Sequence, residues 1–527
     1  MNFCKRFASL LVAALVMLSL SAPAFAASPL GSVTMKDTAG NVKVNSTYEA
    51  YQIVTWNMSE LDGQFLYTDM VLNAAYRNAI IGEIGAPLSA ASTDAEILKA
   101  IADLNETTQA GKIAALAVAL SKVTRPADYT AASGVFSNLP YGYYLIRETA
   151  NNATDGTVLS KPILVSVPDR AAGNPAISVT VKTSTATIDK DIVLGEGPTA
   201  TTAKSAEKKI GDTVNFKLSA TIPSYAADAT GIVYSITDLL SKGLSFTADS
   251  VVVKAANGSV IPALDHYTVT TAAPDSEGNL ALKIDFVYDK IKDAGALSIS
   301  YSAVLNTSAI IGSQGNRNSV SLTYSNQPGV NTYTTPQEHT VVYTTGIELT
   351  KLAKGELSNL KLEGATFGLY SDPACTKPAR FYTYKLVTDK DGHTVISTEL
   401  IPGDAAGTVT SDFNGVVHFT GLIAGTYYIK ETKAPAGYNL LKDVIVLTVS
   451  VKLPPAIHTG LESAQWTTTN TSFDNKGGIF HADIMNTKGF QLPGTGGMGT
   501  TLFTLGGASL LAVAGGLFVY YRKKNRA

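Results

Sequence analysis

Two sets of a lysine, a carboxylic acid and an asparagine could form covalent bonds inside this protein. In each set the lysine lies on an early segment of strand-like alternation, the acid on a middle one and the asparagine on a late one. Burial lowers the pKa of an amine and raises that of a carboxyl group. A neutral lysine could then attack an asparagine polarised by a protonated acid, with loss of ammonia. The sets are Lys190, Asp238 and Asn318, and Lys351, Glu431 and Asn486.

Each of these residues by itself is more simply explained as a solvated strand lysine or a turn asparagine. The chemistry requires a fold that brings the lysine and the asparagine together, and the first and last strands of a β-sandwich are commonly neighbours. Holding two reacting groups side by side removes roughly 7 to 11 kcal/mol from a reaction barrier. Asn318 is preferred in the middle set because apolar alternation starts directly after it, and Asn316 is the alternative.

Other kinds of catalysis have little support in the sequence. No two of the six histidines stand at helical or hairpin metal spacing, so no metal site is predicted, and no cofactor is expected. Phosphate-binding loops and Gly-x-Ser-x-Gly motifs are also missing from the sequence. The net charge of -2 without a basic stripe argues against nucleic acid as a partner. A wall-anchored enzyme is therefore a weaker hypothesis than a structural protein.

The pattern of polar and apolar residues predicts a mainly all-β protein. Alternation recurs along much of the chain, with turn residues between short segments, as in β-sandwiches. One helical insertion is expected near residue 93, where Thr93 and Glu96 form a capping-box pattern before apolar residues at helical spacing. We predict three tandem immunoglobulin-like β-sandwiches, the first with the helical insertion. Their ranges are residues 27–182, 183–345 and 346–491.

The two ends of the chain predict export and membrane attachment. Residues 1–26 have a basic start, an apolar stretch and a small-residue end, as in a secretory signal peptide. Residues 502–521 are apolar over the length of a bilayer and are followed by a Lys/Arg cluster. After removal of the signal only Cys375 remains of the two cysteines, so an internal disulfide is impossible, and we expect this thiol to be buried.

Several motifs together resemble a known family. The residues just before the apolar stretch resemble the Leu-Pro-x-Thr-Gly cell-wall sorting signal of Gram-positive bacteria. Residues 136–148 and 419–431 repeat one plan of an aromatic residue, a glycine turn, a Tyr-Tyr pair and a glutamate. With Gly-Ala-Thr-Phe-Gly-Leu-Tyr at residues 364–370 and Ile-Gly-Asp-Thr-Val at 210–214, the chain resembles the major backbone pilins of sortase-assembled pili. The sorting residues are Leu492, Pro493, Gly494, Thr495 and Gly496.

The resemblance implies roles for individual residues. The family consists of collagen-adhesin-like, immunoglobulin-type sandwiches with Lys-Asn isopeptide bonds, so Glu431 matches the acid of its E-box motif, and Lys351 and Asn486 match the bonded pair. Lys190 and Asp238 match the pattern of the middle domain. Glu148 also matches an E-box, but no asparagine stands on the strand expected at residues 177–182, so we expect no crosslink in the first domain and a structural role for this glutamate.

The resemblance also implies how subunits would be joined. A sortase cysteine would attack the carbonyl of Thr495, and a lysine at the end of the first domain of the next subunit would accept the acyl group. Lys182 occupies that position, although its Val-Thr-Val-Lys context lacks the Tyr-Pro of the family motif, and Lys190 is a neighbouring alternative.

The expected function is that of a structural backbone subunit of a covalent surface fimbria. The expected partners are a class C-type pilus sortase, other copies of the chain, ancillary pilins, the peptidoglycan and host receptors. The expected location is the cell wall after transient membrane anchoring. The alternatives are an ancillary pilin or a monomeric wall-anchored adhesin, which would need no acceptor lysine.

Overall fold

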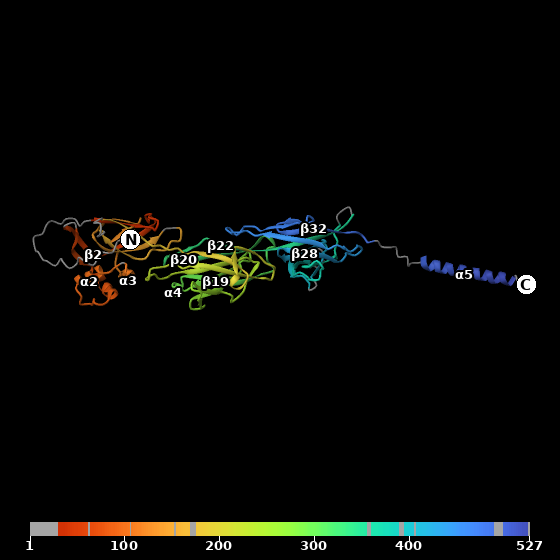
Figure 1. Cartoon of the computed structure of the whole chain (residues 1–527), viewed down its shortest axis with the longest axis horizontal. Coiled ribbons are helices and arrows are strands. Elements are labelled where there is room, and N and C mark those ends of the chain that lie inside the picture. The colour runs from red at the N-terminus through yellow and green to blue at the C-terminus, as the bar shows by residue number, and fades with distance from the viewer. Residues whose placement is uncertain are drawn as a thin grey trace.

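The computed structural model shows an extended chain of strand-rich parts. It describes residues 30–61, 64–105, 107–151, 154–168, 175–355, 360–388, 395–404, 407–489 and 499–524. Three strand-rich parts follow one another along the long axis, and helix α5 (Gly499–Lys524) extends beyond the third (Figure 1). The mainly all-β prediction is confirmed. The predicted signal peptide and the sorting residues 492–496 lie outside the described residues.

The first part consists of two sheets and a helical layer. One sheet has the order β5-β1-β8, and the other has the order β3-β2-β6-β7 with β4 beside β2. The strands are β1 (Leu30–Lys36), β2 (Ser46–Leu61), β3 (Gln64–Leu72), β4 (Tyr129–Ala131), β5 (Val135–Pro140), β6 (Gly142–Asn151), β7 (Ile163–Val167) and β8 (Ala176–Thr180). Val33, Tyr48 and Tyr144 belong to the core that joins the two sheets.

The predicted helical insertion packs on the other face of the second sheet. It contains η1 (Ala74–Tyr76), α1 (Arg77–Ile84), α2 (Asp94–Ala102) and α3 (Ala110–Ser121). The Thr93 hydroxyl accepts a hydrogen bond from the Glu96 backbone, and the Glu96 carboxylate accepts one from the Thr93 backbone at 2.6 Å. This reciprocal arrangement is the predicted capping box. Ile80 and Leu116 of the helices pack with Ile53 of β2 in a separate core.

The middle part is a sandwich of two sheets. One has the order β10-β9-β12-β19-β15-β16 with β14 beside β19, and the other begins β17-β18-β13-β20-β22, with β21 beside β20 and β11 beside β22. The elements are β9 (Ile188–Leu194), η2 (Gly197–Thr199), β10 (Thr201–Ala203), β11 (Ser205–Glu207), β12 (Thr213–Thr221), β13 (Tyr234–Leu240), β14 (Leu244–Phe246), β15 (Val252–Ala255), β16 (Val260–Ile261), β17 (Tyr267–Thr271), β18 (Leu280–Phe286), α4 (Tyr288–Ile291), β19 (Ala296–Leu305), β20 (Gly312–Gln327), β21 (Asn331–Thr334) and β22 (Glu338–Ala353).

The last part is also a sandwich. Its first sheet has the order β32-β22-β27-β24-β25, with β31 beside β32, and the facing sheet has the order β26-β23-β28-β29-β30. The remaining strands are β23 (Thr366–Tyr370), β24 (Tyr382–Thr388), β25 (Val395–Pro402), β26 (Thr408–Thr410), β27 (Val416–Leu422), β28 (Gly425–Lys433), β29 (Ile445–Lys452), β30 (Gln465–Thr468), β31 (Asp474–Lys476) and β32 (Ile479–Asn486).

Strand β22 belongs to both the middle and the last part. Its residues up to Thr344 pair with β20, and from Thr345 onward they pair with β27. The joint is further fixed by the Tyr343 hydroxyl, which donates to the Glu462 carbonyl, and by the Ala424 amide, which donates to the Glu207 carboxylate at 2.8 Å. A continuous strand leaves the junction no free linker, so the two sandwiches are joined as a stiff unit.

Candidate crosslinking sites in the domain cores

The last sandwich brings Lys351 against Asn486. Strands β22 and β32 run parallel, with Lys351 opposite Ile484 and Asn486 opposite Ala353. Alternate residues of a strand share one face, so Asn486 lies on the same side of the sheet as Ile484. The Lys351 Nζ donates to the Asn486 Oδ1 at 2.6 Å and to the Ile484 carbonyl at 3.0 Å. The amine therefore lies beside the amide carbon that it would have to attack.

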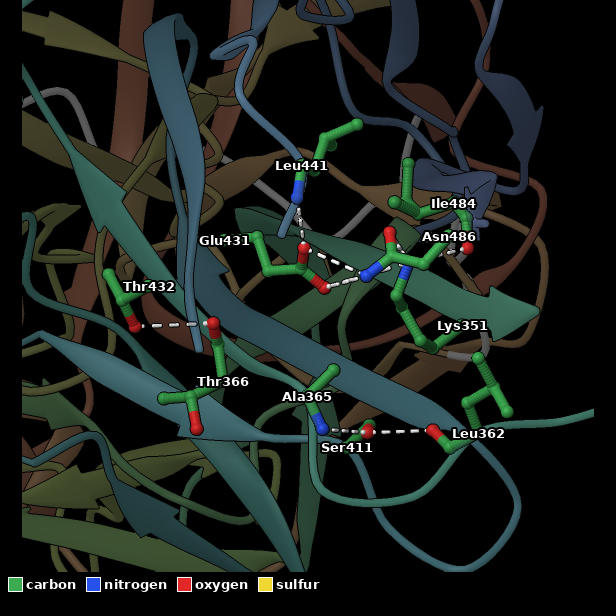
Figure 2. Close-up of polar contacts among 10 residues, drawn as sticks. All are labelled: Lys351, Leu362, Ala365, Thr366, Ser411, Glu431, Thr432, Leu441, Ile484 and Asn486. Carbon is green, nitrogen blue, oxygen red and sulfur yellow. Dashed lines mark hydrogen bonds and ion pairs between the residues drawn. The ribbon is translucent and has the colours of Figure 1, made fainter. Parts of the chain in front are cut away.

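Glu431 approaches the same amide from the facing sheet. Both of its carboxylate oxygens accept hydrogen bonds from the Asn486 Nδ2 at 2.9 Å, as Figure 2 shows. One oxygen also accepts from the Leu441 backbone amide at 2.6 Å, and the other lies 3.6 Å from the Lys351 Nζ. Each of the three side chains belongs to a residue that is at most 2% exposed. The site thus holds the lysine at the oxygen of the amide and the acid at its nitrogen.

Burial changes the protonation of the lysine in this site. It lowers the pKa of Lys351 to about 8, although the Glu431 carboxylate favours the charged amine and opposes the shift. The aromatic ring of Phe367 lies 5.9 Å from the Nζ and adds to the apolar surroundings. A lysine in this environment loses its proton far more readily than one in water.

In the middle sandwich the first predicted set of lysine, acid and asparagine comes from both sheets. Lys190 lies in β9 of one sheet, whereas Asp238 of β13 and Asn318 of β20 lie on neighbouring strands of the other sheet. The Lys190 Nζ donates to the Asp238 Oδ2 and, at 2.7 Å, to the hydroxyl of Tyr301. That hydroxyl donates to the Asp238 Oδ2 at 2.8 Å and accepts from the Asn318 Nδ2 at 2.7 Å.

The middle site is sealed from solvent. Lys190, Asp238 and Asn318 are fully buried, and burial lowers the pKa of Lys190 to about 8 against the opposing charge of Asp238. Burial also raises the pKa of the Asp238 carboxyl group. Among the described residues, neither the Asp238 Oδ1 nor the Asn318 Oδ1 has a hydrogen-bond partner. Both oxygens are thus buried without a hydrogen-bond donor from the described part of the chain.

The two sites differ in what a bond would join. In the last sandwich Lys351 and Asn486 lie on adjacent strands of one sheet, so a bond would tie its first strand to its last. In the middle sandwich Lys190 reaches across the core from one sheet to the other. Asn318 also does not lie on the last strand, because β22 follows β20 and pairs with it. The expectation of adjacent first and last strands therefore describes the last sandwich and not the middle one.

Asn316, the alternative to Asn318, has another set of partners. Its Oδ1 accepts from the Ile310 amide at 2.8 Å, and its Nδ2 donates to the carbonyls of Ile310 and Val342. These bonds hold the loop before β20 against β22. The structure therefore brings Asn318, and not Asn316, to the Tyr301 hydroxyl that also contacts Lys190.

Among the described residues of the first domain, the structure does not bring a lysine and an asparagine together at Glu148. This glutamate is 6% exposed and accepts from the Ser160 amide at 2.6 Å, much as Glu431 accepts from Leu441. The nearest lysine contact is Lys43, whose Nζ lies 4.0 Å from the carboxylate. Strand register, counted from the paired phenylalanines of the two repeats, puts Asp37 and Thr183 at the positions of Lys351 and Asn486. This pair cannot form a Lys-Asn bond.

Lys182 is exposed just after β8, between two anchored residues. The amide of buried Val181 donates to the Lys36 carbonyl at 2.8 Å, and the Ser184 carbonyl accepts from the Val158 amide at 2.9 Å. Its side chain is therefore presented to solvent from a fixed backbone. Beyond the last sandwich, residues Thr504–Lys524 of α5 form a helix of 21 residues with mean hydropathy 1.4, long and apolar enough to cross a membrane.

The expectation for Cys375 was wrong. This residue is only partly buried and lies in a turn with a positive φ of 53°, where Asp372 binds the amides of Thr376 and Lys377. A turn at the surface leaves the thiol without the apolar packing that we expected. In the part of the chain that the structure describes, no group of three or more His, Cys, Asp or Glu residues is placed to hold a metal ion.

The stability of an uncrosslinked middle domain should depend on pH through Lys190. In Asn318→Ala the amine stays free, with a pKa of about 8 in the folded chain against 10.5 when unfolded. Below pH 8 Lys190 is protonated in both the folded and the unfolded chain, so the folded domain carries the full destabilisation of a buried ammonium. As pH rises from about 8 to about 10.5 the unfolded state holds more protons, so stability increases, by about 3 kcal/mol in total.

This prediction is checked by unfolding the protein in urea at a series of pH values across that range. The fluorescence or circular dichroism signal of the middle domain reports its unfolding. The double variant Lys190→Met/Asn318→Ala is the control and should lose the extra pH dependence. Equal pH dependence in the two variants would contradict the assignment of a strongly buried amine.

Comparison with known protein families matches three regions of the chain. The description "Gram-positive pilin backbone subunit 2, Cna-B-like domain" matches residues 210–328, and "prealbumin-like fold domain" of the SpaA type matches residues 346–458. An LPXTG cell-wall anchor motif matches residues 484–527. The first two matches lie in the middle and last sandwiches, and the third includes α5.

Two curated proteins are similar over longer stretches. The trypsin-resistant surface T6 protein of Streptococcus pyogenes serotype M6 is 27% identical over 388 residues, which cover 60% of this chain and 65% of that protein. The fimbrial subunit type 1 of Actinomyces viscosus is 26% identical over 476 residues, 81% of each chain. Among solved structures, the T6 backbone pilin aligns with a TM-score of 0.48 at 20% identity, covering 89% of this chain and all of that one. The major pilin SpaD of Corynebacterium diphtheriae aligns with a TM-score of 0.45 at 18% identity, covering 88% and 98%.

Proposed function

We propose that this chain, which carries the domains and the wall anchor of a Gram-positive backbone pilin, is the repeating structural subunit of a covalent surface pilus. A pilus sortase of the class C type joins Thr495 of one subunit to Lys182 of the next. Internal Lys-Asn isopeptide bonds reinforce the middle and last domains. The protein is thus a structural component and not an enzyme that acts on external substrates.

The observation that carries this proposal is the burial of two complete sets of lysine, acid and asparagine in successive sandwiches. An isolated buried ammonium and carboxylate are costly, and an apolar replacement is often as stable or more stable. Here each ion pair also contacts the side-chain amide of an asparagine, directly in the last site and through a tyrosine in the middle one. Reactive groups in hydrogen-bond reach of each other support a covalent role for these residues.

The last site supports the following reaction. Lys351 gives one proton to Glu431 and becomes a neutral amine, and its Nζ attacks the Cγ of Asn486. A new C–N bond forms, the bond to Nδ2 breaks, and the nitrogen leaves as ammonia after gaining one proton. The Nζ loses a second proton in the same reaction, and Glu431 returns to its carboxylate form by releasing the remaining proton to the ammonia or to solvent. The contact of both Glu431 oxygens with the Nδ2 places the proton donor at the leaving group.

The acceptor role of Lys182 is supported by its exposure and by the order of the parts along the rod. In sequence the lysine lies between the first and middle domains, and the sorting residues come after the last domain. Linking these two positions joins subunits end to end and leaves both crosslinked sandwiches within the load path. A bond that bridges strands or sheets keeps a loaded sandwich from separating.

We further propose that the assembled pilus contains ancillary pilins, is attached to the peptidoglycan, and contacts host receptors in colonisation. Helix α5 would hold the chain in the membrane until the sortase cleaves after Thr495. An ancillary pilin or a monomeric wall-anchored adhesin would use the same anchor and would need no acceptor lysine.

Substitution of Lys182 distinguishes these roles. In a strain that expresses Lys182→Ala, the ladder of high-mass polymers in cell-wall extracts should be lost, because no nucleophile remains for the acyl group. An immunoblot against this chain measures it. Lys161→Ala is the matched control, since Lys161 is also an exposed lysine of the first domain. An unchanged ladder in Lys182→Ala would overturn Lys182 as the acceptor and point to another exposed lysine, since Lys190, the alternative considered from the sequence, is buried in the middle core. Wild-type cells without any ladder would favour the adhesin.

A further inference from the structure

Tyr301 contacts every member of the middle crosslinking set. It lies in β19, is 3% exposed, and its ring stacks on Phe216 with 5.2 Å between the ring centroids. Its hydroxyl accepts from the Lys190 Nζ and from the Asn318 Nδ2, both at 2.7 Å, and donates to the Asp238 Oδ2 at 2.8 Å. A hydroxyl with two acceptor positions and one donor position is completely used by these three bonds.

In the last sandwich the acid itself makes the contact that the Tyr301 hydroxyl makes in the middle one. There the acid is a glutamate, and it contacts the departing nitrogen directly at 2.9 Å. In the middle site the acid is an aspartate, one methylene shorter, and the tyrosine hydroxyl stands between it and the Asn318 nitrogen. The aromatic ring that lies under the Lys351 Nζ is that of Phe367, which has no hydroxyl. The two sites therefore deliver a proton to the amide nitrogen in different ways.

We propose that Tyr301 is a catalytic residue of the middle crosslink and relays a proton from Lys190 to the departing nitrogen of Asn318. This inference rests on the proposed Lys190-Asn318 bond. Lys190 first passes a proton to Asp238, which leaves a neutral amine and a neutral acid. Once Asp238 is protonated, it no longer has to accept the hydrogen bond from the Tyr301 hydroxyl. The hydroxyl can then turn and donate to the Asn318 Nδ2.

The bond-forming step balances through this hydroxyl. The Nζ of Lys190 attacks the Cγ of Asn318 and a C–N bond forms. Tyr301 takes one proton from the Nζ and gives its own proton to the Nδ2, which leaves as ammonia when its bond to the Cγ breaks. The products are a secondary amide and ammonia, and the tyrosine is unchanged. Asp238 then returns its proton to the solvent or to the ammonia as the products separate.

The test follows the intact mass of the chain from residue 27 to residue 495. All core clusters lie between residues 33 and 484, and α5 stands apart from the sandwiches, so this chain contains the described folded domains. In Tyr301→Phe, loss of ammonia from the middle site should be slowed about 100-fold, within the range that a positioned proton-transfer group contributes. The ammonia lost at Lys351 and Asn486 should be unaffected and reports that the last domain has folded.

A second variant separates catalysis from folding. Fluorination of the Tyr301 ring keeps the hydroxyl in place and lowers its pKa, so this variant should form the bond with a shifted pH dependence of the rate. Rapid crosslinking in Tyr301→Phe would overturn the relay while leaving the bond itself established. Absence of the bond in the fluorinated variant with a folded middle domain would also overturn it. A wild-type chain that keeps the ammonia of the middle site would refute the proposed crosslink on which the relay rests.

Discussion

The chain from residue 27 to residue 495 is expected to weigh less than its sequence by two molecules of ammonia. Each of the substitutions Asp238→Ala and Glu431→Ala should restore one of them, because each removes the acid that takes the first proton from the lysine. High-resolution mass spectrometry of the intact chain measures the deficit. Tandem spectrometry of a tryptic digest should find the peptides of Lys190 and Asn318 joined, and those of Lys351 and Asn486 joined.

Glu148→Gln is the control for this experiment. Glu148 occupies the same place in its repeat as Glu431 and is also buried, but in the part of the first domain that the structure describes its contacts are with Ser160 and Lys43 and not with an asparagine. Its substitution should therefore leave the deficit at two. A folded wild-type chain with an unmodified mass would refute both crosslinks, and a third ammonia lost from the first domain would refute the assignment of Glu148 as structural.

The sequence was sufficient to propose the three residues that meet in the last sandwich, because each of them has a local marker. Glu431 follows a Tyr-Tyr strand that is repeated in the first domain, Lys351 ends an alternating segment, and Asn486 ends the final one. A parallel pairing of the first and last strands then aligns Lys351 with Ile484 and leaves Asn486 on the same face. Pattern and topology lead to one arrangement here.

The middle site was found in part. Lys190, Asp238 and Asn318 could be proposed from spacing, but Tyr301 could not, since one more tyrosine in an alternating strand looks like any other core residue. What identifies it is register: β12 lies between β9 and β19, and the stacking on Phe216 aims the hydroxyl at the acid. The position of Lys190 on the sheet opposite Asp238 and Asn318 likewise follows from strand order, which the alternation of polar and apolar residues does not reveal.

The surface position of Cys375 depends on a turn held by Asp372. A single cysteine in a sequence does not indicate whether it lies in such a turn or in the core.

Loss of the last crosslink should greatly lower the stability of the last domain. The bond between Lys351 and Asn486 closes a loop of 135 residues, and the chain-entropy argument used for disulfides gives about 5 kcal/mol for such a loop. In Asn486→Ala this constraint on the unfolded chain is removed, and Lys351 and Glu431 remain as a buried ion pair without the amide between them. A loss of this size lowers the melting temperature of a domain of this length by on the order of 15 °C. Differential scanning calorimetry resolves the transition.

Two comparisons decide whether the bond, rather than lost packing, causes this change. Asn439→Ala removes an exposed asparagine of the same domain, whose side chain donates long hydrogen bonds to the Thr487 hydroxyl at 3.4 Å and the Lys488 carbonyl at 3.2 Å, and should lower the transition far less than Asn486→Ala. Glu431→Ala prevents the bond by another deletion, and its transition should fall by a similar amount although different atoms are missing. Because the Lys190 bond lies in another core, the middle transition should stay in place in both variants. A last domain that melts at the wild-type temperature after its ammonia has been restored would show that the crosslink contributes little to equilibrium stability. The bond would then act only under load, where a covalent tie between the first and last strands still prevents the sheet from unzipping.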